Sequence, residues 1–208
     1  MRFPYASAVA SFALLTALTG CHVSPLKNGD NDNVDIATPF GSVQVKTNDN
    51  AAAAGLGITP YPGAQLIKKG DKKDGEDGGS ADVNMSFGNF HLGVKAVSYT
   101  TNDGQNEVLA FYRKNLARYG DVIQCQGKRT IGQPTRTAEG LTCDTEKNNH
   151  MSWNTDTEHT MELRAGSKQH QHIVAVENKD GGTRIGLVAL DFPTNFSTDD
   201  RSDHKDSD

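Results

Sequence analysis

The sequence predicts an α+β domain in which one main amphipathic helix, at about residues 102–119, packs on one face of a mostly antiparallel sheet. Three observations carry this prediction. Only the stretch TNDGQNEVLAFYRKNLARYG repeats apolar residues at convincing helical spacing. Several short stretches alternate apolar and polar residues, as strands with one buried face do. Turn signals rich in glycine separate these stretches, which is typical of strands joined by hairpins.

The N-terminal segment is typical of a secretory signal peptide. Arg2 supplies a positive charge, and an uncharged, largely apolar run follows as far as Gly20. A spanning helix needs about 20 predominantly apolar residues, so this run is too short and too weakly flanked. LTGC, residues 18–21, resembles the lipobox of bacterial lipoproteins, in which the cysteine thiol receives a diacylglyceryl group. The alternative is a plain secretory signal that places a cysteine near its cleavage site.

The resemblance to bacterial lipoproteins implies a location in the cell envelope. Cleavage would remove residues 1–20 and leave Cys21 as the lipid attachment site, with a further acyl chain such as palmitate on its amine. Two or three acyl chains hold a protein stably on a membrane, whereas one gives marginal binding. His22 stands where enteric lipoproteins retained on the inner membrane have Asp. The expected location is therefore the outer membrane, facing the periplasm.

Two segments are expected before the main domain. Residues 21–33 are polar and turn-rich, which predicts a flexible tether. Residues 34–57 predict a β-hairpin and a linker, because VDIAT and SVQVK alternate on either side of a turn. Within that segment, NDNAAAAGLG predicts a weak linker or a single helical turn. The hairpin is expected as an extra layer or an independent attachment.

The main domain is expected over residues 58–192. ITPYPGAQLI bends at its prolines into a short strand, and the charged, glycine-rich stretch 68–80 predicts an exposed loop. Residues 81–101 predict two strands or one bulged strand. In the helix, one apolar face collects Val108, Leu109, Tyr112, Leu116 and Tyr119. Asn102 is the expected N-cap, and Gly120 is expected to end the helix in a left-handed conformation.

Strand patterns return after the helix. They cover DVIQC, LTCDT, TMELRA, HIVAVEN and TRIGLVALDF, with a hairpin turn predicted between the last two. Residues 193–208 predict a disordered acidic tail. Cys125 and Cys143 are predicted to form a disulfide, since a secreted chain with one remaining cysteine pair most simply bridges it. A reactive dithiol would normally show Cys-x-x-Cys spacing, which these two cysteines lack.

Composition and motifs exclude several classes of function. The formal net charge is −5 and there is no strongly basic run, so no nucleic-acid partner is expected. The sequence carries none of the common hydrolase or metalloprotease motifs and no phosphate-binding loop. No enzyme activity and no cofactor are therefore predicted. Catalytic groups brought together from distant positions remain the alternative.

Four histidines are candidate ligands for a metal ion. His170 and His172 are two residues apart and would face the same side of a strand, with His150 and His159 upstream. A zinc site needs three or four converging ligands, which a His-x-His pair alone does not secure. The alternative is that both imidazoles lie on a solvated face. No metal is predicted, and these histidines remain weak candidates.

Three aromatic residues are candidate partner contacts. Tyr61 lies between prolines, Phe111 lies at the edge of the helix stripe, and Trp153 stands in a polar stretch. Two of them have a structural alternative: Tyr61 could pack at the end of the sheet, and Trp153 could cover a sheet edge.

The motif order from 58 to 192 is similar to a group of uncharacterised envelope proteins of soil bacteria such as the Acidobacteria. The similarity is carried by GITPYPGA, EVLAFYRKNLARYG, the Cys125 strand, ELRAGSKQHQHIVAV and GGTRIGLVALDF. It implies a shared domain and transfers no catalytic residue. We therefore expect a non-enzymatic, lipid-anchored binding module with an envelope protein as partner. The alternative is a periplasmic small-ligand or metal-binding protein that uses the histidine region.

Overall fold

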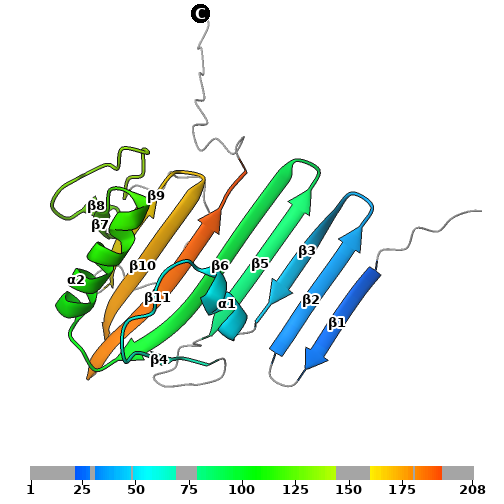
Figure 1. Ribbon diagram of the computed structural model, residues 1–208, viewed down its shortest axis with the longest axis horizontal. Coiled ribbons are helices and arrows are strands. Elements are labelled where there is room, and N and C mark those ends of the chain that lie inside the picture. Colours follow the sequence, from blue (N-terminus) through cyan, green and yellow to red (C-terminus); the bar gives the residue numbers. More distant parts are fainter. Residues whose placement is uncertain are drawn as a thin grey trace, which may run out of the picture.

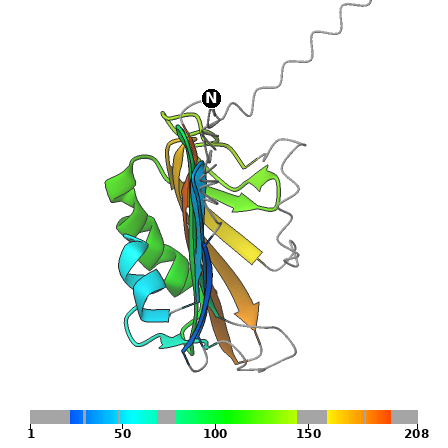
Figure 2. The ribbon, with the colours of Figure 1, turned by 90° about the vertical axis from the view of Figure 1, so that its right-hand side faces the viewer.

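The fold is an open antiparallel sheet with helices on one face. The computed structural model describes residues 22–28, 31–47, 49–68, 79–143, 160–179 and 181–193. Within these ranges one sheet contains eleven strands in the order β1-β2-β3-β5-β6-β11-β10-β9-β7-β8, with β4 paired to β6 (Figure 1). Both α-helices lie on the same side of the sheet (Figure 2). No helix in this part of the chain is long and apolar enough to cross a membrane.

The elements follow one another mostly as hairpins. Their bounds are β1 His22–Asn28, β2 Asn31–Thr38, β3 Gly41–Lys46, α1 Asp49–Gly55, β4 Gln65–Leu66, β5 Ser80–Phe87, β6 Phe90–Thr101, α2 Gln105–Leu116, the 3-10 helix η1 Ala117–Tyr119, β7 Ile123–Gln126, β8 Arg129–Thr130, β9 Thr160–Gly166, β10 His170–Lys179 and β11 Gly182–Asp191. The chain is thus mostly β, rather than a balanced α+β domain, because the sheet continues well beyond the strands that the helices cover.

The N-terminal part differs from the sequence prediction. Residues 22–28 of the expected tether form β1, which pairs antiparallel with β2. The β2–β3 hairpin lies where the sequence predicts one, and β3 pairs with β5, so it extends the main sheet instead of forming a separate layer. Pairing within the sheet satisfies backbone groups that a free tether would leave to water.

A short helix forms where the sequence predicts a weak linker or a single helical turn. In α1 and just after it, Ala52, Leu56 and Ile58 are buried in the main core. The alanine run is too short to show a helical period, which is why the pattern of the sequence does not distinguish a linker from a helical turn. Its burial moves the start of the core upstream of residue 58.

The main helix packs on the sheet as predicted, with a different start. The helix α2 contacts β9, β10 and β11, and its buried residues are Val108, Leu109, Tyr112 and Leu116. Gly104, not Asn102, is the N-cap. The Gln105 side-chain amide donates to the carbonyl oxygen of Val176, which ties the first turn to β10. Gly120, with φ of 111°, follows η1 and ends the helical segment.

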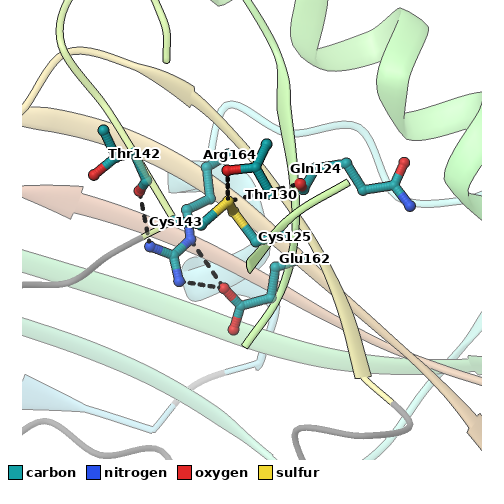
Figure 3. The surroundings of a disulfide bond; sticks show 7 residues. All are labelled: Gln124, Cys125, Thr130, Thr142, Cys143, Glu162 and Arg164. Atoms are coloured by element: carbon teal, nitrogen blue, oxygen red, sulfur yellow. Dashed lines mark hydrogen bonds and ion pairs between the residues drawn. A yellow bond between two sulfur atoms is a disulfide. The ribbon is translucent and has the colours of Figure 1, made fainter. Parts of the chain in front are cut away.

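A disulfide closes the far edge of the sheet. Cys125 in β7 is bonded to Cys143, as the sequence predicts, and their Cα atoms are 5.5 Å apart (Figure 3). Residues 141–143 are irregular, so the strand predicted for LTCDT does not form over them. A small second core surrounds the bond, made by Ile123, Cys125, Leu141 and Cys143. Beside it, Arg164 Nε donates to Glu162 Oε2 over 2.9 Å.

Candidate interaction surface

The face of the sheet that the helices leave uncovered is lined with apolar side chains. Alternate residues of a strand project from opposite faces, and directly paired residues project from the same face. Val83 pairs with Val94, Met85 with Leu92 and Phe87 with Phe90 across β5 and β6. Asp82 and Lys95, one rung away, therefore lie on the helix side, where they form an ion pair of 2.6 Å.

The apolar lining extends over the neighbouring strands. Val45 pairs with Val83 and Val43 pairs with Met85, and β2 continues the row with Val34 and Ile36. On the other side, β11 places Leu190 opposite Val94 and Val188 opposite Ala96. We call this set the open apolar face: Val34, Ile36, Val43, Val45, Ala81, Val83, Met85, Phe87, Phe90, Leu92, Val94, Ala96, Val188 and Leu190.

Exposure separates the two faces of the sheet. On the helix side Val97, Ile185 and Leu187 are fully buried. No residue of the open apolar face is fully buried, and Phe87 and Phe90 are 40% and 36% exposed. The same alternating strands therefore produce a packed core on one side and accessible apolar surface on the other.

The most exposed aromatic residues gather at one end of this face. The β2–β3 turn carries Phe40, which is 84% exposed. The β5–β6 turn lies beside it, because Gly41 pairs with Phe87 and Phe87 pairs with Phe90 (Figure 1). We call residues 37–41 and 87–91 the hairpin end. They contain no Asp, Glu, Lys or Arg.

The histidine candidates have separate local partners. His170 Nδ1 lies 2.7 Å from Asp191 Oδ1 at the exposed start of β10. The His172 ring stacks on the Tyr119 ring, with centroids 3.6 Å apart. Burial lowers the pKa of His172, an effect that the nearby Asp191 carboxylate partly opposes. His150 and His159 lie outside the described residues.

No metal centre forms among the residues that the structure describes, because no group of three or more His, Cys, Asp or Glu side chains converges there. A shallow hollow beside α2 is lined by Leu109, Arg113, Lys114 and Gln124. The Arg113 guanidinium donates to the Gln124 side-chain oxygen, so the clearest pair of polar groups in the hollow bond to each other. Neither feature forms a built ligand site.

Two of the three aromatic candidates take part in packing. Tyr61 and Phe111 make an edge-to-face contact with ring centroids 5.1 Å apart, and both lie against the main core. The Tyr61 hydroxyl donates to Asp103 Oδ2 over 2.8 Å, and this hydrogen bond raises the pKa of Tyr61. These contacts correspond to the structural alternative for Tyr61. Trp153 and Cys21 lie outside the described residues.

Phe40, Phe87 and Phe90 were not predicted as contact residues from the sequence. The alternation of their strands marks which of their neighbours share a face. It does not reveal that both α-helices cover the opposite face, because helix placement is a tertiary property. Two phenylalanine-bearing turns, TPFG and FGNF, were the available signal.

Comparison of the chain with protein-family models, with curated proteins and with solved structures finds no match.

Proposed function

We propose that this protein is a lipid-anchored, non-enzymatic interaction module of the bacterial envelope, and that its open apolar face binds an envelope protein. One observation carries the proposal: a continuous apolar surface spans at least β2, β3, β5, β6 and β11, and none of its side chains is fully buried. Large contiguous apolar patches on soluble domains usually mark binding sites.

The energetics favour a partner that is itself apolar. Burial of a Val, Leu, Phe or Met side chain contributes about 1.5–3 kcal/mol when it is complete. Several half-buried residues on one flat face can therefore contribute substantially without any charged contact. The ion pair of Asp82 and Lys95 lies on the other side of the sheet, so a partner on this face does not have to desolvate it.

The anchoring part of the proposal is supported by LTGC at residues 18–21. Replacing Cys21 by Ser should move the protein from the membrane fraction to the soluble periplasmic fraction, because acyl chains could no longer be attached at this residue. Fractionation followed by immunoblotting measures this. An unchanged distribution would contradict the anchor and leave the binding face to be tested separately.

Site-specific photocrosslinking in intact cells tests the binding face. A photoreactive residue at Met85, on the open apolar face, should give a discrete protein adduct. A matched probe at Ser86, one residue along β5 and on the helix side, should not give that adduct. Val83→Asp should abolish it, because a carboxylate would be buried at the contact. Equal crosslinking from both positions, or none from Met85, would refute the proposal.

A further inference from the structure

We infer that the hairpin end rests on the lipid bilayer, so that Phe40, Phe87 and Phe90 enter the membrane interface and the sheet stands upright on the membrane. This inference rests on the proposed anchor at Cys21 and goes beyond it by assigning an orientation. The occupant of the hairpin end is thus a lipid surface, whereas the rest of the open apolar face remains for the protein partner.

The path of the chain places the anchor beside the hairpin end. In the β1–β2 ladder His22 pairs with Ala37, the first residue of that end. Cys21 is covalently adjacent to His22, and consecutive Cα atoms are about 3.8 Å apart. Any acyl chain on Cys21 therefore starts next to the β2–β3 turn. Figure 1 shows β1 beginning at the end of the sheet where this turn and the β5–β6 turn lie.

The chemistry of the hairpin end suits a membrane interface. Its three phenylalanines are exposed, and its turns lack the charged groups that resist transfer from water. The contact between His170 and the Asp191 carboxylate lies farther across the sheet, on β10 and β11. Asp191 pairs with Gly93, which belongs to the helix side of β6, so this carboxylate does not share the face of Phe90.

Lipid chains and inserted side chains have complementary roles. Acyl chains hold a protein at the membrane but leave it free to rotate about the point of attachment. Apolar side chains that enter the interface add binding energy and fix the orientation of the domain. With the hairpin end on the bilayer, the strands rise away from the membrane. The open apolar face then points sideways, where an envelope protein can reach it.

Tryptophan quenching by brominated lipids tests the orientation. Phe40→Trp and Val34→Trp are compared in a Trp153→Phe background, so that each protein has a single tryptophan. The lipidated proteins are placed in vesicles of phosphatidylethanolamine and phosphatidylglycerol that also contain brominated phosphatidylcholine. Val34 is a matched control, since it is exposed on the open apolar face but lies about 13 Å down β2 from Thr38. Quenching should be at least about twofold stronger at position 40. Equal quenching, or stronger quenching at position 34, would overturn the inference.

Vesicle partitioning of residues 21–208 carrying Cys21→Ser separates the inference from the anchor. Phe40→Ser with Phe90→Ser should lower the partition coefficient about tenfold, while Val34→Ser should leave it within about twofold. No measurable partitioning of the parent chain, or equal losses in both variants, would count against lipid contact. If the double variant loses the Met85 crosslink but partitions normally, a protein occupies the hairpin end and the inference is wrong. Failure of the anchor alone would leave the partitioning of the Cys21→Ser chain unchanged.

Discussion

At the residue scale, His172 is a strand residue whose ring is partly buried against the Tyr119 ring. Its alternation with Val174 and Val176 places it on the helix side of β10, where both valines are fully buried. Tyr119, at the end of η1, stacks on the imidazole, and the Tyr119 hydroxyl donates to the carbonyl oxygen of Gly57. His172 Nδ1 is buried and has no hydrogen-bond partner. Burial lowers the pKa of His172, and its ring contributes to packing against Tyr119.

We predict that His172→Phe reduces the pH dependence of stability. The pKa of His172 in the folded protein lies below its ordinary value of 6.5, because burial penalises the charged ring. As the pH falls below 6.5, the unfolded chain takes up the proton first, so folding becomes less favourable. Phe keeps a ring for stacking on Tyr119 and does not titrate. Urea unfolding at pH 7.5 and 5.5 should show a smaller difference for the variant, and an equal difference would contradict the prediction.

At the element scale, the strands and main helix that the sequence predicts are those with a long, regular period. The strands β6, β9, β10 and β11 and the helix α2 fall where their patterns place them. The helix α1 was predicted only as a weak linker or a single helical turn because it is short, and β1 was missed because its polar sequence gives no alternation. Both depend on neighbours, since α1 packs on β5 and β6 and β1 pairs with β2.

Leu116→Ala should destabilise the protein by about 2–5 kcal/mol, since it leaves a cavity where α2 meets the sheet. Leu116 is fully buried in the main core. Lys114→Ala, two residues earlier on the exposed side of α2, should change the free energy of unfolding by less than about 0.5 kcal/mol. Chemical denaturation followed by circular dichroism measures both. Equal effects would mean that α2 does not contribute its apolar stripe to the core.

At the scale of the whole molecule, the sheet has two unequal parts. The main core lies between the helices and the strands β6, β9, β10 and β11, and it takes no buried residue from the side chains of β2 and β3 that the structure describes. The strands β2 and β3 contribute instead to the open apolar face, and β1, which pairs with β2, begins at the hairpin end. The strands under the helices thus form the main core, and β2 and β3 extend the open apolar face.

The disulfide should stabilise the whole fold through the unfolded chain. Cys125 and Cys143 are 18 residues apart, and closing a loop of that size lowers the free energy of folding by about 3 kcal/mol. The double variant Cys125→Ala, Cys143→Ala should therefore unfold at lower urea concentration. Reducing agent should shift the wild-type transition in the same direction and leave the variant unchanged. A wild-type transition unaffected by reduction would show that the bond contributes nothing.

The sequence alone determined the local features of this protein. It placed the amphipathic helix, the alternation of most strands and the Cys125–Cys143 pair, because these depend on the spacing of residues along the chain. It also predicts the lipid anchor at Cys21. The spacing of residues does not reveal which face of the sheet the helices cover, because that depends on how distant segments pack. That choice is physical: a strand with apolar residues on both faces can bury either, and the packing of α1 and α2 leaves Met85, Phe87 and Phe90 accessible.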